Sequence, residues 1–367
     1  MRKSLSAIIF FTFFSCTVRS SAPVIDIPQV ADFEWRVDDS GDAVITGYTG
    51  AGGAVTIPHE INWAPVISIK DGAFSDKRLT SVTIPSSVTS IGFGAFQKNQ
   101  LAGIDIPASV TSIRGSAFGE NFNLRAINIH PDNKNYSSID GVMYDKTGTT
   151  LLQWPAGKGT VVTIPNSVTA IGDWAFYGIN LTALIIPDSV TTIGAHSFAL
   201  NQLSELSIPA SVTSIGTDAF FRNKLKSLVI PPSITSIGHG VFCSNELSSV
   251  VIPNTVTSIG IGAFRRNQLS AIAIPNSVTI IESQAFFYNL LSSLTIPSSV
   301  TAIDTEAFSN NRLTSITIGA NVQLYIGRHG DTVFEDTGNF DETYRSGGML
   351  AGTYIRSNVD SSEWIRR

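Results

Sequence analysis

The chain has 367 residues, of which 43% are hydrophobic and 14% charged, and its formal net charge is −5. This sparse, mildly acidic charge argues against nucleic acid as a partner, because phosphate binding requires a basic face. The composition, which is poor in methionine and rich in serine, threonine and glycine, favours β structure.

The N-terminus has the pattern of an export signal. Arg2 and Lys3 precede an apolar run from residue 5 to residue 14, which is too short to span a bilayer. We predict a signal peptide over residues 1–22. Ser15 directly before Cys16 also fits a lipoprotein signal, in which Cys16 becomes the lipidated first residue, while ordinary cleavage near Ser20 fits as well. Both outcomes predict export.

One segment recurs along most of the chain. Its phenylalanine returns every 22 residues except for one step of 58, at positions 74, 96 and 118 and then 176, 198, 220, 242, 264, 286 and 308. A proline and a leucine keep the same interval. Self-similarity at a fixed period of this length is the signature of a solenoid.

A single copy, LTSVTIPSSVTSIGFGAFQKN, can be interpreted physically. Its first half alternates apolar and polar residues, as a half-buried strand does, and Pro85 ends that strand. Val88 and Ile91 form a second short strand, and Phe96 fills the corner. One copy cannot bury its apolar faces alone, whereas stacked copies can. We therefore predict a β-rich repeat solenoid of about ten coils with little α-helix, capped at both ends, whose phenylalanines form a single internal column.

The motif L-x-x-V-x-I-P-x-x-V-x-x-I-G-x-x-A-F-x-x-N resembles the BspA-like leucine-rich repeat of bacterial surface proteins, over roughly residues 69–320. Many members of that family carry Cys where this chain carries Asn99 and its equivalents. The resemblance implies a curved leucine-rich-repeat array with the LTSVTI strands on the concave side. It also implies export and contact with other cells or host proteins.

Three departures from the motif define the predicted domains. Residues 23–68 are interpreted as an N-terminal cap with a lead-in repeat, residues 69–320 as the solenoid, and residues 321–367 as a C-terminal cap that ends in a hairpin. The long step holds an insertion near residues 130–160, where Asp145-Lys146-Thr147-Gly148 predicts a β-hairpin. The hairpin could expose Tyr144 and Trp154 to a partner, but we favour an elaborated coil that packs these aromatic residues.

Catalytic and metal-binding interpretations find little support in the sequence. For His196 and His239, which lie nearly two coils apart, we expect no cysteine or acid in phase at ligand spacing, and no G-x-S-x-G turn is present. Cys243 occupies a variable position. Glu282 and Asp304 fall at equivalent places in adjacent coils and could hold a cation or act as an acid/base pair, although an exposed acidic edge is the simpler interpretation. We predict no enzyme activity and no cofactor.

The exposed rows of the LTSVTI strands are the predicted partner-binding surface, because stacked strands make a broad, preformed face. The middle of these rows is apolar, and serine and threonine flank it on both sides. A rimmed apolar patch marks an interface, yet β-branched residues also favour strands for their own sake. The predicted partner-binding residues are Ile185, Glu205, Ser207, Val229, Ser249, Val251 and Ala273.

Two functions follow from this surface. The first is an exported, adhesin-like protein that binds another protein, such as a host extracellular protein or a cell-surface component, through its concave sheet. The second is a structural spacer or coat component of the cell envelope that has no specific ligand. For both functions we expect no nucleic acid partner, and we expect the protein to be attached to a membrane only through a lipid on Cys16. The sequence names neither the partner nor the oligomeric state.

Overall fold

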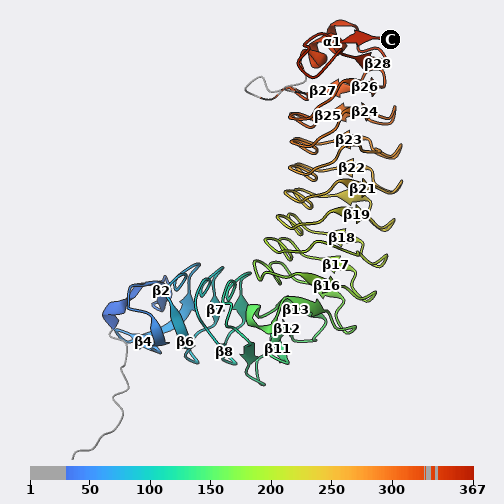
Figure 1. Cartoon of the computed structure of the whole chain (residues 1–367). Helices are drawn as coiled ribbons and strands as arrows, with labels where there is room; N and C mark the ends of the chain where they lie inside the picture. The colour runs from blue at the N-terminus through green and yellow to red at the C-terminus, as the bar shows by residue number, and fades with distance from the viewer. Residues whose placement is uncertain (1–29, 326, 328–331, 335–337) are drawn as a thin grey trace, which may run out of the picture.

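The computed structural model describes residues 30–325, 327, 332–334 and 338–367. These residues form a β-solenoid of about 13 turns of about 22 residues each (Figure 1). The predicted fold class is confirmed, but the predicted number of about ten coils is too low, because segments outside the phenylalanine-bearing copies also wind into turns. The predicted signal peptide, residues 1–22 with Cys16, lies outside the described residues.

Most coils contain a long strand and a short strand. The long strands carry the LTSVTI segment and the short strands carry the SI pair that follows it. The long strands are β3 (Gly53–Thr56), β6 (Leu79–Thr83), β8 (Gly103–Ile106), β10 (Ala126–Ile129), β14 (Val161–Thr163), β16 (Ala183–Ile185), β19 (Ser227–Val229), β21 (Ser249–Val251), β24 (Ser293–Thr295) and β26 (Ser315–Ile318). The short-strand series is β5 (Ala64–Ile69), β7 (Ser90–Ile91), β9 (Ser112–Ile113), β13 (Thr150–Gln153), β15 (Ala170–Ile171), β17 (Thr192–Ile193), β18 (Ser214–Ile215), β20 (Ser236–Ile237), β22 (Ser258–Ile259), β23 (Ile280–Ile281), β25 (Ala302–Ile303) and β27 (Gln323–Leu324).

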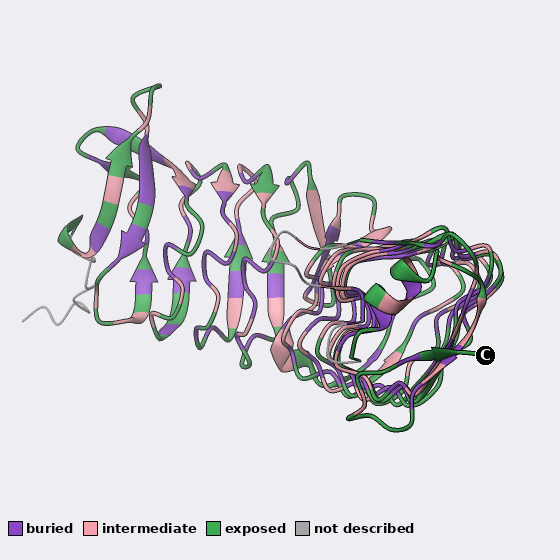
Figure 2. Cartoon of the chain, turned by 90° about the horizontal axis from the view of Figure 1, so that it is seen from above, coloured by how far each residue is buried: buried purple, intermediate pink, exposed green. Residues whose placement is uncertain are grey.

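In most coils, parallel pairing places a residue beside the one that follows it by 22 positions, whereas the offset is 23 between β8 and β10 and 21 between β25 and β27. Leu228 of β19 pairs with Val250 of β21, and Ile259 of β22 pairs with Ile281 of β23. Because residues paired side by side in a sheet point to the same face, equivalent side chains share one face from coil to coil. Figure 2 looks down the arm that carries these strands, where successive coils overlie one another around a shared interior.

The recurrent phenylalanines are buried and stack ring on ring, as predicted, but in two columns instead of one. Phe74 stacks on Phe96 with ring centroids 5.2 Å apart, and Phe96 on Phe118 at 6.0 Å. The second column begins at Trp154, which stacks on Phe176 at 5.7 Å, and continues through Phe308 to Phe334. The division falls at the 58-residue step, and the buried core is divided there as well.

The inserted segment forms the corner between two arms of the array (Figure 1). We call residues 33–129 the N-terminal arm and residues 150–325 the C-terminal arm. Between them, β11 (Tyr136–Ile139), β12 (Val142–Asp145) and β13 form an antiparallel meander, and the predicted turn joins β12 to β13. Tyr144 is buried and Trp154 packs on Phe176, so the interpretation as an elaborated coil is confirmed.

Trp174 connects the two arms at this corner. Its ring lies edge-on to Phe93 of the N-terminal arm at 5.0 Å and stacks on His196 of the C-terminal arm at 4.1 Å. A Cβ at Gly115 would come within 2.5 Å of the Trp174 ring. Glycine is therefore required at position 115 for the arms to approach this closely.

Both ends of the array are covered. At the N-terminus, a short 3-10 helix (Val30–Asp32) precedes the hairpin of β1 (Phe33–Val37) and β2 (Ala43–Tyr48), and β2 pairs with β5. At the C-terminus, α1 (Phe340–Ser346) buries Phe340 and Tyr344. The predicted terminal hairpin is confirmed as β28 (Gly352–Ile355) paired with β29 (Ile365–Arg366), and β28 also pairs with β26. The helix was not predicted.

The turn between β4 (Glu60–Ile61) and β5 holds a strained tryptophan. Asn62 and Trp63 have φ of 52° and 68°, and the Trp63 side chain is 91% exposed. Two positive φ values at a two-residue hairpin loop favour Asn-Gly, since a side chain costs about 1–2 kcal/mol in this conformation. We expect Trp63→Gly to raise the free energy of unfolding by about 1 kcal/mol. Urea denaturation followed by circular dichroism measures it, and a decrease would show that the exposed ring stabilises the fold.

Candidate partner-binding face

We call the exposed side of the long strands the long-strand face. All seven residues predicted to bind a partner are exposed on it. Ile185, Val229 and Val251 are the last residues of β16, β19 and β21. Ser249 begins β21. Glu205, Ser207 and Ala273 lie in the intervening copies, where residues 205–207 and 271–273 form no strand.

An apolar patch lies in the C-terminal arm of this face. It consists of Val161, Ile185, Val229 and Val251, whose exposed fractions are 71%, 61%, 66% and 58%. The exposed Ser207 lies between Ile185 and Val229 in the same row, and Val161 lies in the neighbouring row, paired with Ala183. Val161 was not among the predicted residues. Its segment, VVTIP, has the same register as LTSVTIP, so the repeat itself contained the signal that would have identified it.

The same face is polar in the N-terminal arm. Thr83, Asp105 and Asn128 occupy positions equivalent to Ile185 and Val229, and all three are exposed. The Nδ2 of Asn128 donates a hydrogen bond of 2.8 Å to Oδ1 of Asp105 on the neighbouring strand. The long-strand face thus has an apolar region and a separate region with one carboxylate.

The recurrent asparagines have a structural role. Oδ1 of Asn245 accepts a hydrogen bond from the Leu225 N–H of the preceding coil at 3.1 Å. Its Nδ2 donates to the carbonyl oxygens of Phe220 and Phe242 at 3.0 and 3.2 Å. Equivalent bonds recur from Asn99 to Asn311. The predicted ladder of amides bonded to the backbone at each turn is confirmed.

Many of the abundant hydroxyl groups are also engaged between coils. The Thr257 hydroxyl donates to the Thr235 carbonyl at 3.2 Å, and the Thr279 hydroxyl donates to the Thr257 carbonyl at 3.2 Å. On the proline turns, the Ser189 hydroxyl donates to the Val168 carbonyl at 2.7 Å. These side chains satisfy backbone carbonyls of neighbouring coils, which explains their abundance without nucleophilic chemistry.

The two candidate acidic residues bind backbone groups. Oε2 of Glu282 accepts from the Ile261 N–H of the preceding coil at 3.1 Å, and Oδ1 of Asp304 accepts from the Thr305 N–H at 2.8 Å. Each carboxylate thus stabilises a turn of the backbone. In the described part of the chain, no group of three or more His, Cys, Asp and Glu side chains could hold a metal ion.

Cys243 is a half-buried free thiol. Burial raises the pKa of this thiol, while a hydrogen bond with Ser244 lowers it to a lesser extent. A raised pKa leaves little of the thiolate that reacts with electrophiles. His196 stacks on Trp174, and its Nδ1 lies 3.9 Å from Oδ2 of Asp218. Asp218 follows His196 by one interval of 22 residues, so the prediction that no acid shares the phase of this histidine is wrong. Neither Cys243 nor His196 lies in the apolar patch.

Comparison with known proteins agrees with this architecture. The model of the BspA type leucine rich repeat region matches in six copies over residues 56–153, 158–247 and 235–344. No curated protein matches the chain. Among the residues that the structure describes, no helix has the length and apolar character needed to cross a membrane.

Several solved structures are similar to this chain. A leucine-rich repeat protein from Eubacterium ventriosum is 22% identical with a TM-score of 0.49, covering 82% of this chain and 97% of its own. The pneumococcal vaccine antigen PcpA is 21% identical with a TM-score of 0.41, covering 69% and 78%. A leucine-rich cell surface protein from Faecalibacterium prausnitzii is 22% identical with a TM-score of 0.33, covering 77% and 92%. Since the family model matches more than half of the sequence and the coils repeat as that motif requires, the chain belongs to the BspA-type leucine-rich repeat family.

Proposed function

We propose that this protein is exported and binds another protein through its long-strand face, the face that the family resemblance places on the concave side. The apolar patch is the observation that carries the proposal. Binding would rest on shape and buried area, with no bond made or broken. Surrounding serine and threonine side chains would form the polar rim that protein interfaces have around an apolar centre.

Strand propensity alone does not explain the patch. Threonine is β-branched like valine and isoleucine and favours strands in the same way. The chain places threonine at the equivalent position in flanking coils, at Thr83, Thr163, Thr295 and Thr317. Threonine would therefore have sufficed at positions 185, 229 and 251. Apolar residues there expose hydrocarbon to water, which favours a partner that covers it.

The dimensions of the patch suit a protein partner. Val161 lies in the coil four repeats before that of Val251, and strand spacing in a sheet is about 4.8 Å, so the patch extends about 20 Å along the array. Standard protein interfaces bury about 800 Å² on each partner. A partner that buries this area would cover the patch and also the serine and threonine side chains around it.

Substitution of the patch tests this proposal. We expect Val229→Asp or Val251→Asp to weaken partner binding at least tenfold, because an unpaired carboxylate would have to be buried. Ser236→Asp provides the matched control, since Ser236 is exposed on the short strand of the same coil as Val229. Pull-down of host and bacterial surface proteins with each variant, with folding checked by circular dichroism, measures the difference. Unchanged capture by both valine variants would contradict the proposal and favour the spacer function.

A further inference from the structure

One edge of the C-terminal arm carries an excess of cations. It consists of the turns that follow the short strands β18, β20, β22 and β23, residues 218–225, 240–247, 262–269 and 284–291, which we call the basic corner. These segments contain four cationic side chains, Arg222, Lys224, Arg265 and Arg266, and two carboxylates, Asp218 and Glu246. In a chain with a net charge of −5, such a local excess of positive charge attracts anions.

Three arginines of the basic corner have no anionic partner in the described part of the chain. Elsewhere, Arg114 forms an ion pair with Asp71. No ion pair among the described residues involves Arg222, Arg265 or Arg266. The Nε of Arg265 is also buried without a hydrogen-bond partner among these residues. An unpaired guanidinium that is partly withdrawn from water favours an anion that comes from outside.

Aromatic rings hold two of the guanidinium heads in separate coils. The guanidinium carbon of Arg222 lies 5.2 Å from the ring centroid of Phe221, in its own coil. That of Arg266 lies 6.0 Å from the ring centroid of Tyr288, in the next coil. The two arginines are themselves two coils apart, which is about 10 Å at the usual strand spacing. A ligand that contacts both heads therefore needs anionic groups repeated along its length.

Arg265 and Arg266 bring two heads close to one coil. The guanidinium carbon of Arg265 lies 5.2 Å from the ring centroid of Phe287. Since the centroids of Phe287 and Tyr288 are 6.3 Å apart, the two heads lie over adjacent rings. A guanidinium fork occupies both oxygens of a carboxylate. A sulfate group has a third acceptor oxygen, and it can therefore bond the second head as well.

The backbone and an exposed ring favour a polysaccharide over a peptide. The N–H groups of Arg222, Ser244 and Arg266 already donate to carbonyl oxygens of the following coil at 2.8–3.0 Å. They are therefore not free to pair with an added peptide strand. The Tyr288 side chain is 58% exposed, and the negative face of such a ring attracts the polarised C–H groups of a sugar.

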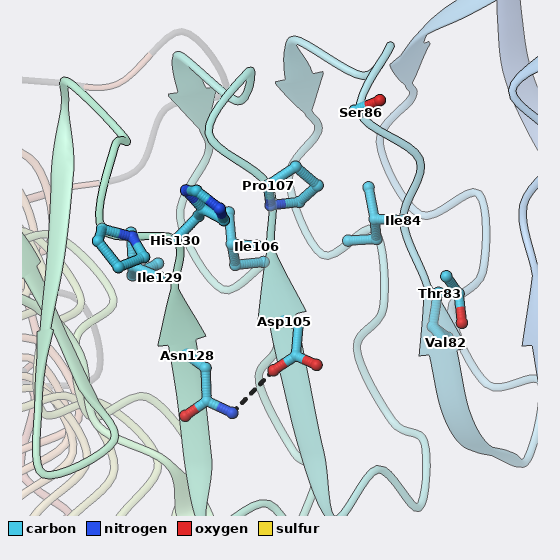
Figure 3. Close-up of a pocket in the computed structure, with 11 residues that line it drawn as sticks. Val82, Thr83, Ile84, Ser86, Asp105, Ile106, Pro107, Asn128, Ile129 and His130 are labelled. Carbon is cyan, nitrogen blue, oxygen red and sulfur yellow. Dashed lines mark hydrogen bonds between the residues drawn. The ribbon is translucent and has the colours of Figure 1, made fainter.

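The long-strand face of the N-terminal arm has the opposite charge. Its pocket of about 550 Å³ presents the carboxylate of Asp105 beside the carboxamide of Asn128 (Figure 3). No lysine or arginine lines this pocket. An anionic ligand is repelled there, so we expect it at the basic corner instead.

We propose that the basic corner binds a linear sulfated polysaccharide that runs along the C-terminal arm. Its sulfate groups bond Arg222, Arg265 and Arg266, and one of its sugar rings packs on Tyr288. Sulfated polysaccharides lie outside cells, so the choice of this ligand over nucleic acid rests on the proposed export. The basic corner contains no residue of the apolar patch, and it therefore adds a second binding surface for a different class of partner.

Calorimetric titration of the full chain tests the class of ligand. The probes are a heparin octasaccharide, the same octasaccharide after chemical removal of its sulfates, and a single-stranded DNA oligonucleotide of the same charge. We expect saturable binding of the heparin octasaccharide and at least tenfold weaker binding of the other two. Rising salt should weaken binding of the sulfated ligand, because ion pairs are involved.

Variants test the location of the site. Arg222→Gln and Arg266→Gln should each weaken binding of the heparin octasaccharide at least fivefold, and Tyr288→Ala should weaken it at least threefold. Arg125→Gln, which removes an exposed arginine of the N-terminal arm, is the matched control and should leave the affinity unchanged. Circular dichroism checks that each variant is folded.

Three results would each overturn the proposal. They are absent binding of the heparin octasaccharide, equal affinity for its desulfated form or for the DNA, and unchanged affinity in the Arg222→Gln and Arg266→Gln variants. These titrations do not involve Val229 or Val251, so their failure leaves the proposed function standing. Conversely, loss of protein capture in Val229→Asp should leave the affinity for the octasaccharide unchanged.

Discussion

Replacing Phe264 with alanine should lower the free energy of unfolding by about 3–5 kcal/mol, the usual cost of truncating a buried phenylalanine. The Phe264 side chain is fully buried between Phe242 and Phe286, with ring centroids 5.8 and 5.4 Å away. Truncation removes both ring contacts and leaves a cavity that neighbouring coils cannot fill without breaking their register. Urea denaturation monitored by circular dichroism measures this loss.

Phe287 provides the matched control. It belongs to the adjacent coil but is only partly buried, and its ring contacts the guanidinium of Arg265 at 5.2 Å and the ring of Tyr288 at 6.3 Å. We expect Phe287→Ala to lower the free energy of unfolding by about 1 kcal/mol, which is the contribution of an exposed cation–π contact. Similar losses in the two variants would show that the column does not dominate the core. Solenoid coils contact only their neighbours. In the Phe264→Ala variant, the coils that precede residue 264 and the coils that follow it should therefore unfold in separate transitions.

The second large effect is expected for Asn245→Ala, which should lower the free energy of unfolding by about 2–4 kcal/mol. A buried donor left without a partner costs about 1–3 kcal/mol, and the hydrogen bonds of the Asn245 amide are lost as well. The Leu225 N–H would lose the acceptor Oδ1 of Asn245, the only one it has among the residues that the structure describes. The two carbonyl oxygens are affected less. Phe220 keeps a bond from Asn223, and Phe242 keeps one from Asn267. Hydrogen exchange at the Leu225 amide should therefore accelerate most.

Asn245→Asp distinguishes the acceptor from the donor. The variant keeps the acceptor for Leu225 but loses both donor hydrogens and buries a carboxylate beside two carbonyl oxygens. Burial and this repulsion should raise the pKa of the introduced carboxyl. Its deficit in stability relative to the natural chain should therefore shrink as pH falls, because the protonated form regains a donor. A deficit that does not depend on pH would contradict this role for the amide.

The coil could be predicted from the sequence because one motif fixes both strands and their burial. Leu79, Val82 and Ile84 alternate with polar residues, and all three are buried. The interval of 22 residues then places equivalent side chains in one row. The exposed apolar residues Ile185, Val229 and Val251 were found in this way, as positions in a register.

The remainder depends on contacts that no single copy encodes. The division of the phenylalanine column follows from the corner, where Trp174 packs over Gly115 from a different arm. The helix α1 lies in a segment where the repeat has decayed, although Phe340 and Tyr344 have the spacing of one helical face. The strands β6 and β8 do not pair with each other, although their sequences match the same motif.

Photocrosslinking tests most directly whether the long-strand face is the binding surface. A benzoylphenylalanine residue is placed at Val229 or at Val251, and the protein is irradiated with its captured partner. The control places the same residue at Ser236, on the short strand of the coil that contains Val229. We expect adducts with one partner from positions 229 and 251 and none from position 236. Adducts from position 236 alone, with binding intact in all three variants, would contradict it.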